Sequence, residues 1–134
     1  LHRAEGFGLP LAEAMDLGKP VIATHWSGNV DFMSPDNSGT VRYRLTRIGR
    51  DYGPYKAEQM WAEPDEEHAA SLMGRMALDV DWRRTIAAAG QRTIRERFSP
   101  EAAGSRIRRR YEQLLDGSAV RLPAVQFGGS QPFA

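Results

Sequence analysis

The chain has 134 residues, of which 41% are hydrophobic and 26% charged, and its formal net charge is +1. These values are typical of one ordinary globular domain, and so small a charge does not draw the whole molecule to nucleic acid or anionic lipid. The absence of cysteine excludes disulfides, thiolate metal sites and a cysteine nucleophile. Neither a secretory signal nor an apolar run of membrane-spanning length is recognisable, so we expect a cytoplasmic protein, with peripheral membrane association as the alternative.

The first half of the chain predicts a loop, a short helix and two strands. Pro10 suits the first turn of a helix and Gly18 the left-handed position after its end, which predicts a helix over 9–17. The compact apolar run 19–24 is typical of a buried parallel strand. Alternation over 40–48 predicts a half-buried strand. Shorter expected features are a helical turn at 29–33, a turn at 35–39 and a surface loop at 49–56.

The second half predicts three helices. Asp65, Asp81 and Ser99 are the expected N-caps, because their side chains accept hydrogen bonds from the first backbone N–H groups of a helix. The expected bounds are 66–80, 82–97 and 100–116, after an extended piece at 61–64. Apolar residues at helical spacing should face inward: Ala69, Leu72, Met73, Met76 and Val80, then Trp82, Ile86, Ala89, Ile94 and Phe98, and finally Ala103, Ile107, Tyr111 and Leu114. The methionines are expected in the core: Met15, Met33, Met60, Met73 and Met76.

Two glutamates flank a glycine-rich loop in the sequence Glu-Gly-Phe-Gly-Leu-Pro-Leu-Ala-Glu (residues 5–13). A sugar nucleotide carries a diphosphate between two rings rich in hydroxyls, and a carboxylate accepts hydrogen bonds from two hydroxyls at once. Glu5 and Glu13 can therefore each serve one ring. The backbone N–H groups of residues 6–9 lie at the positive end of the predicted helix, which suits phosphate. Judged on spacing alone, two such glutamates are more often solvated surface acids.

The filled motif resembles the donor-binding signature of retaining GT-B glycosyltransferases of the group 1 (family 4) type. That family includes sucrose synthases, glycogen synthases and many bacterial mannosyl- and glucosyltransferases. The resemblance continues as Ala-Met-Asp-Leu-Gly-Lys-Pro-Val-Ile-Ala-Thr to Thr24. Matches to a bacterial branch follow in Ser27-Gly-Asn-Val-Asp-Phe-Met and in Trp61-Ala-Glu-Pro-Asp. The similarity covers nearly all of residues 5–115.

This resemblance implies an α/β fold, the C-terminal portion of a Rossmann-like donor domain over 1–117, with few parallel strands, flanking helices and a helical C-terminal half. A flexible or docking tail would follow at 118–134. Glu5 would be the catalytic residue, contacting the transferred sugar, and Glu13 would contact the ribose. The implied donor-binding residues are Gly6, Phe7, Gly8, Leu9 and Glu13. The family transfers a hexosyl group from a nucleotide-sugar donor to a sugar or lipid-linked acceptor with retention of configuration, and needs no metal or other cofactor.

The main departure from the family is the absence of its phosphate-clamping Arg and Lys, which come upstream of the first glutamate. The chain therefore reads as cut from a longer protein, and we expect it to be inactive in isolation. A half-sheet with open edges should associate with itself or with the missing half of the enzyme. The alternative is a non-catalytic sugar-nucleotide-binding or oligomerisation module derived from such an enzyme.

Other features have plainer interpretations. A third function, nucleic-acid binding through the arginine run at 106–110, is the least favoured, because acids dilute the run and a solvated helix face explains it. We therefore expect no nucleic-acid partner. Asp31 is either a helix cap or an acidic group near the site, and Trp26 is expected to pack rather than to border a donor pocket. The histidines show no metal-ligand spacing and are expected in loops or facing solvent: His2, His25 and His68.

Overall fold

The computed structural model describes residues 1–116, and the tail expected at 118–134 lies outside them. The chain divides into two compact units, Leu1–Ser99 and a second one that begins at Pro100. The first is a mixed α/β unit with two small two-stranded sheets. The described part of the second is the helix α4 (Pro100–Leu115) and Asp116 after it. The expected mixed α/β class with a long helical C-terminal half is confirmed at this level.

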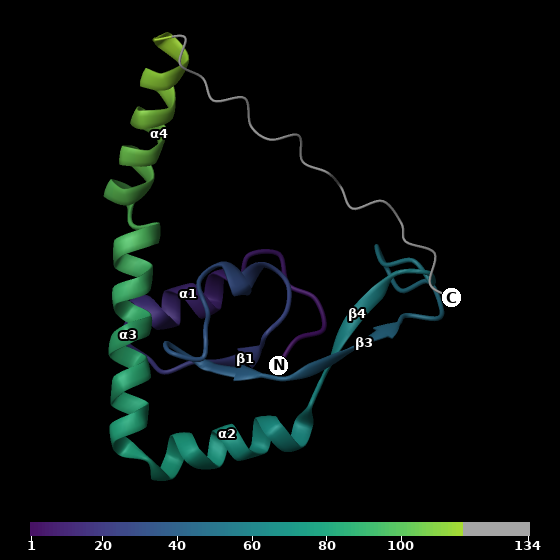
Figure 1. Cartoon of the computed structure of the whole chain (residues 1–134). Helices are drawn as coiled ribbons and strands as arrows, with labels where there is room; N and C mark the ends of the chain where they lie inside the picture. The colour runs from purple at the N-terminus through teal and green to yellow at the C-terminus, as the bar shows by residue number, and fades with distance from the viewer. Residues whose placement is uncertain (117–134) are drawn as a thin grey trace. The chain divides into compact units, whose positions relative to one another are not determined.

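A parallel pair of strands forms the first sheet, as the apolar run 19–24 predicted. Strand β1 (Ile22–Thr24) pairs with β2 (Gly39–Val41), with Ala23 opposite Thr40. Between them the chain makes the 3-10 helix η1 (Gly28–Asp31), near the helical turn expected at 29–33. In the view of Figure 1, helix α1 (Leu9–Asp16) lies above this sheet and helix α2 (Glu66–Leu78) below it.

Helix α1 begins and ends at glycines. Gly8, with φ of 87°, is its N-cap, and Pro10 occupies its first turn. After its end, the N–H of Gly18 donates to the Met15 carbonyl and that of Lys19 to the Ala14 carbonyl, both at 2.9 Å. These paired bonds make a Schellman motif, in which Gly18 takes a φ of 67° that a side chain would disfavour. The helix predicted over 9–17 is confirmed.

Helix α3 (Val80–Phe98) packs across α1 (Figure 1), and its Ile94 belongs to the buried core. The Gln91 amide donates to the Asp16 carbonyl at 2.8 Å, tying the middle of α3 to the end of α1. Gly90 allows the two helices to approach, since a Cβ there would lie 3.0 Å from the Met15 Cε. The buried core cluster consists of Ala12, Met15, Val21, Ala23, Phe32, Met33 and Ile94.

The single half-buried strand predicted over 40–48 is wrong. The chain leaves the parallel sheet at Arg42, whose N–H donates to His68 Nδ1 at 3.0 Å and whose carbonyl accepts from Asp65 N at 2.8 Å. Both the N–H and the carbonyl of Arg42 are hydrogen-bonded to residues at the start of α2. They are therefore not available for pairing with a neighbouring strand, and the parallel sheet ends there. The following β3 (Tyr43–Arg47) instead pairs antiparallel with β4 (Met60–Pro64), and all of β3 except Thr46 is exposed. We call β3, β4 and their connection, residues 43–64, the ribbon.

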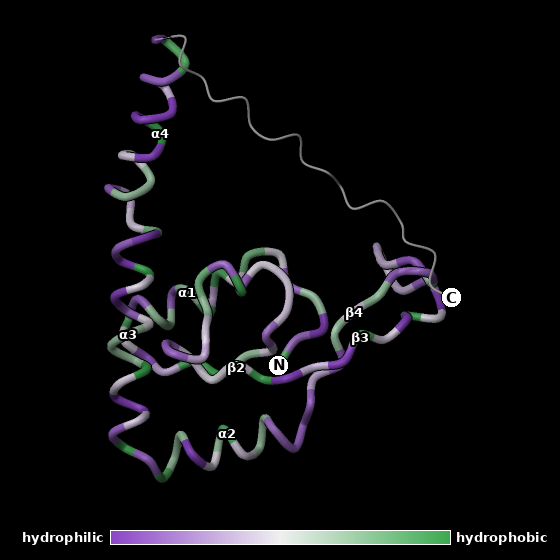
Figure 2. The backbone as a smooth tube through the Cα atoms, in the orientation of Figure 1, coloured by the Kyte–Doolittle hydropathy of each residue, from purple (hydrophilic) through white to green (hydrophobic). Residues whose placement is uncertain are grey.

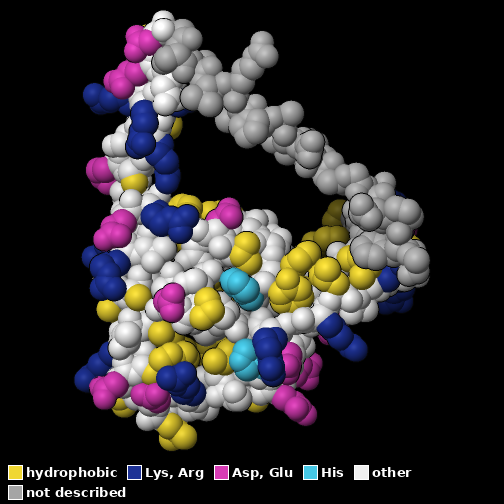
Figure 3. Space-filling model, viewed as in Figure 1, with side chains coloured by type: hydrophobic (Ala, Val, Ile, Leu, Met, Phe, Trp, Pro, Cys, Tyr) yellow, Lys and Arg dark blue, Asp and Glu magenta, His cyan; other side chains and the backbone are white. Residues whose placement is uncertain are grey.

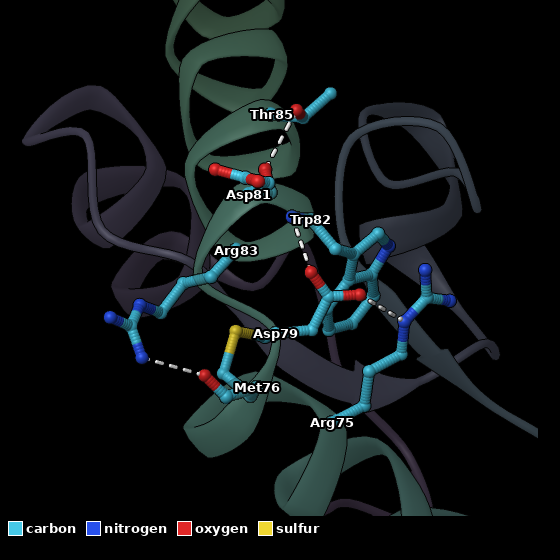
Figure 4. A network of polar contacts seen from close by, with 7 residues as sticks. All are labelled: Arg75, Met76, Asp79, Asp81, Trp82, Arg83 and Thr85. Atoms are coloured by element: carbon cyan, nitrogen blue, oxygen red, sulfur yellow. Dashed lines mark hydrogen bonds and ion pairs between the residues drawn. The ribbon is translucent and has the colours of Figure 1, made fainter.

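The N-caps predicted for the helices of the second half are only partly confirmed. Asp65 caps α2 as predicted, accepting from His68 N at 2.9 Å. The prediction of Asp81 as the next cap is wrong: Asp79 accepts from Trp82 N at 2.9 Å, and Asp81 lies inside α3 (Figure 4). Asp79 also binds Arg75, whose guanidinium lies 4.3 Å from the Trp82 ring centroid. Asp79 therefore joins the end of α2 to the start of α3.

The expected inward faces are confirmed for α3, hold in part for α2, where Leu72 and Met76 are half-buried, and fail for most of α4. Along α3, hydrophilic and hydrophobic segments alternate in Figure 2, and Ile86 and Ile94 are buried. On α2 only Ala69 is buried. Predicted inward residues that are exposed instead are Met73, Val80, Ile107, Tyr111 and Leu114, and the same holds for Met60 of the ribbon. Within that range no helix has both the length and the apolar character needed to cross a lipid bilayer.

Met15→Ala should lower the free energy of unfolding by about 3 kcal/mol, because it opens a cavity between α1 and α3. Met73→Ala is the matched control: Met73 is 63% exposed whereas Met15 is 1% exposed. That variant should change stability by less than about 0.5 kcal/mol. Urea unfolding followed by circular dichroism measures both. Equal losses in the two variants would contradict the assigned core.

Acid should weaken the α2–α3 junction through Asp79. The hydrogen bond from Trp82 N, with Arg75 adding to it, lowers the pKa of Asp79 below its usual 3.8. A lowered pKa stabilises the fold above the unfolded-state value, and this contribution is lost as the pH falls through the folded-state pKa. Asp79→Asn should therefore flatten the pH dependence of unfolding between about pH 5 and pH 2. Asp81→Asn removes a charge without removing a cap and should flatten it less; the reverse ranking would refute the assignment.

Candidate functional site

The N-terminal segment crosses the carboxyl end of β1. His2 N donates to Thr24 Oγ1 at 3.1 Å, and His2 Nε2 lies 3.0 Å from the Trp26 carbonyl oxygen. On its other side, the Arg3 carbonyl accepts from Ala62 N of β4 at 2.9 Å. Ligands of open α/β sheets bind at the carboxyl ends of parallel strands. The glycine-rich loop after this segment is thus held at the edge of the sheet where a ligand is expected.

The loop at residues 5–8 is held against the turn that follows β1. Ser27 Oγ donates to the Glu5 carbonyl, and Gly28 N approaches the same oxygen at 3.4 Å. Ser27 has a φ of 74°, a conformation that is costly for a residue with a side chain. A Cβ on Gly28 would lie 1.6 Å from the Gly6 carbonyl oxygen, so only glycine fits at this position. The backbone of Glu5 is therefore fixed by two residues of the turn.

Phe7 and Gly8 join this loop to the helices. The Phe7 ring packs on Phe32 and Phe98, with centroid distances of 5.1 and 5.7 Å. Gly8 is buried, and a Cβ there would lie 3.2 Å from a Leu11 methyl and 3.3 Å from the Asn29 Cβ. The ring of Phe7 thus anchors the loop through its contacts with Phe32 and Phe98.

The start of α1 has free backbone donors. The Gly8 carbonyl accepts from Leu11 N and Ala12 N, at 2.9 and 3.0 Å, which satisfies two of the first N–H groups. Among residues 1–116, the N–H groups of residues 7–9 donate to no protein acceptor. The helix has no side-chain cap and no acidic residue in its first turn, so neither a capping group nor an acid of that turn offsets the positive end of its dipole. This arrangement suits an anion.

The two glutamates flank that start from opposite sides along the chain. Glu5 is half-buried, and its Oε1 accepts from the neighbouring Gly6 N at 2.9 Å. Glu13 is exposed, and its side chain makes no hydrogen bond or ion pair with another described residue. Leu9 and Glu13 are four residues apart on the exposed face of α1, which is about 6 Å along the helix axis. Both carboxylates can therefore reach solvent near the free amides.

The side chains of His25, Trp26 and Asp31, also singled out from the sequence, make no hydrogen bond, ion pair or ring contact with residues 5–13 in the described part of the chain. Trp26 is half-buried and packs on Tyr43 at 5.2 Å between ring centroids, as the packing interpretation expected. Asp31 is exposed in η1. His25 Nδ1 is buried without a hydrogen-bond partner among the described residues. Within residues 1–116 no three His, Asp or Glu side chains come together as a group able to hold a metal ion.

Sequence reasoning missed the residues that hold the loop. Asn29 is fully buried and its amide donates to the Thr24 carbonyl at 3.0 Å, which fixes the turn after β1. Its Oδ1 has no partner among residues 1–116. The only sequence signal for the turn was the Ser27-Gly28 pair in the loop that follows the predicted strand 19–24, and it does not specify that Gly28 meets the backbone of Gly6.

A cleft of about 890 Å³ lies where the ribbon meets α2, and none of residues 5–13 lines it. Comparisons of the chain with known protein families, curated proteins and solved structures found no match. The functional interpretation therefore rests on residues 5–13 and on the geometry around them.

Gly28→Ala should destabilise the protein by roughly 3 kcal/mol, because the new methyl group collides with the backbone of Gly6 and must displace the loop. Gly6→Ala is the matched control: a Cβ at Gly6 meets no atom within 4 Å. It should change stability by less than about 0.5 kcal/mol. Thermal unfolding of both variants measures the difference. Similar stabilities for the two would show that the close approach does not exist.

Proposed function

We propose that this chain is the nucleotide-sugar-binding part of a retaining glycosyltransferase of the GT-B type. The observation that carries the proposal is the set of free N–H groups at residues 7–9, at an uncapped helix start beside the carboxyl end of a parallel strand. In this proposal the α/β unit is a partial Rossmann-like donor subdomain. The parallel β1–β2 pair, with α1 and α3 packed together, is compatible with such a fragment.

The diphosphate of the donor would lie against the N–H groups of residues 7–9. Two of the donors come from Gly8 and Leu9, at the start of the helix, where backbone N–H groups have no partner within the helix. The partial positive charge of the helix start would favour the charged diphosphate over a neutral ligand. During transfer, the same groups would stabilise the negative charge that builds up on the leaving nucleoside diphosphate.

The two glutamates would distinguish the two ends of the donor. Glu13 lies one helical turn beyond Leu9 and carries no competing partner, so its carboxylate is free to accept the ribose hydroxyls. Glu5 lies before the loop, with its backbone held by Ser27, and would accept hydroxyls of the transferred hexosyl group. A fixed backbone at Glu5 matters because a small displacement of a positioning group slows a transfer reaction strongly. The acceptor in this proposal is a sugar or a lipid-linked sugar.

The proposal predicts different effects for the two glutamates on binding to the 134-residue chain. Glu13→Gln should weaken the binding of both uridine diphosphate glucose and free uridine diphosphate by about tenfold, since each ligand contains the ribose. Glu5→Gln should weaken the binding of the sugar nucleotide only, because only that ligand contains the hexose. Guanosine diphosphate mannose and guanosine diphosphate form the second ligand pair, and calorimetry measures all four.

Glu58→Gln on the ribbon connection is the matched control and should bind like the unaltered protein. The absence of binding for both ligand pairs would overturn the proposal. Binding that neither glutamate affects would overturn the assigned site. Formation of a retained-configuration product from an added sugar acceptor would separate an active transferase from a non-catalytic binding module.

A further inference from the structure

A second cleft, of about 420 Å³, lies between the N-terminal segment and the ribbon. Hydrophobic side chains gather over β3 and β4 in Figure 3, where an ordinary ribbon edge would be polar. The cleft volume falls within the range of small-molecule sites. The lining residues used below are Arg3, Tyr52, Tyr55, Trp61, Glu63 and Glu66.

Three aromatic rings form one wall of this cleft. Tyr52 and Tyr55 each lie 6.4 Å from Trp61 between ring centroids, with their planes steeply inclined to it. The two tyrosines are joined by reciprocal backbone hydrogen bonds, N to O, of 2.9 and 3.0 Å. Tyr52 is nevertheless 58% exposed and Tyr55 37% exposed. The loop is thus held by its backbone, and the rings are presented to solvent instead of filling a core.

A fixed pair of planar charged groups lies beside the rings. Arg3 donates to both Glu63 oxygens, at 2.8 and 2.7 Å, and its guanidinium lies 5.0 Å from the Trp61 ring centroid. The Arg3 hydrogen bond holds the pKa of Glu63 below its usual value, so the carboxylate remains ionised. A bidentate Arg–carboxylate pair has a defined geometry, and its outer lone pairs and N–H groups stay available to a ligand.

The lining of the cleft has no excess of positive charge. Glu63 and Glu66 line it together with Arg3, and Arg50, outside the lining, has its guanidinium 5.9 Å from the centroid of the Tyr52 ring. On the adjoining loop, Lys56 pairs with Asp51 at 3.0 Å. A site for phosphate or nucleic acid needs an excess of positive charge, which this cleft lacks.

We propose that this cleft binds a neutral saccharide. A pyranose ring has an apolar C–H face that suits Tyr52 and Tyr55, and a rim of hydroxyls that suits the Arg3–Glu63 pair and Glu66. Apolar and aromatic walls with a few fixed polar groups are the general composition of small-molecule sites. The inference rests on this lining alone and goes beyond the proposed donor site, with which it shares none of residues 5–13.

Nuclear magnetic resonance of the 134-residue chain tests the proposal directly. The probes are maltotriose, mannotriose and triacetylchitotriose, each titrated to about 10 mM, a range that detects the weak binding expected of an open site. At least one should shift the indole N–H signal of Trp61 in a saturable manner and leave those of Trp26 and Trp82 in place. Tyr52→Ala should weaken that binding about tenfold.

Tyr111→Ala is the matched control, because Tyr111 is 62% exposed on α4 and does not line the cleft. It should bind the trisaccharide like the unaltered protein. The proposal is overturned if no trisaccharide shifts the Trp61 signal, if Tyr52→Ala binds normally, or if inorganic phosphate shifts that signal while the saccharides do not. Binding of sugar nucleotides is a separate measurement, so failure here leaves the donor proposal to its own test.

Discussion

The contact between the backbones of Gly28 and Gly6 is the constraint on which the candidate site depends. A Cβ on Gly28 would lie only 1.6 Å from the Gly6 carbonyl oxygen, so there is no room for a side chain at this position. This approach brings the turn after β1 against the loop before α1 and lets Ser27 bind the Glu5 carbonyl, at the cost of a positive φ at Ser27. Local strain of this kind persists only where surrounding contacts stabilise it, and the buried Asn29 amide provides one such contact.

A cluster of three phenylalanines connects this loop to the rest of the unit. The ring of Phe7, within the loop, packs on Phe32, directly after η1, and on Phe98 at the end of α3. The start of α1 is thus positioned from three directions: by the turn after β1, by α3, and by the buried Ala12 and Met15. Its free amides therefore belong to a helix start that is held in place, the condition under which backbone donors bind or stabilise charge without reorganising.

Sequence reasoning succeeded where a feature is local. The cap at Asp65 and the Pro10 and Gly18 ends of α1 depend on residues within one turn, and the structure has all of them. It failed where the local structure depends on contacts with residues that are distant in the sequence. Alternation over 40–48 could not reveal that α2 takes both backbone groups of Arg42 and splits the strand. Asp79 and Asp81 are equally good caps by residue type, and only the geometry of the α2–α3 junction selects Asp79. The residues of the motif were identifiable; the Gly28 contact was not.

The most direct test of the central claim is to observe the free N–H groups at the start of α1 during titration with uridine diphosphate glucose. The backbone amide signals of Gly8 and Leu9 should shift to lower field with a common saturation curve, as expected when an N–H donates to an anion. The signals of Gly74 and Gly104, glycines inside α2 and α4, should stay in place. Saturable binding that leaves Gly8 and Leu9 unchanged would contradict a diphosphate site at this helix start.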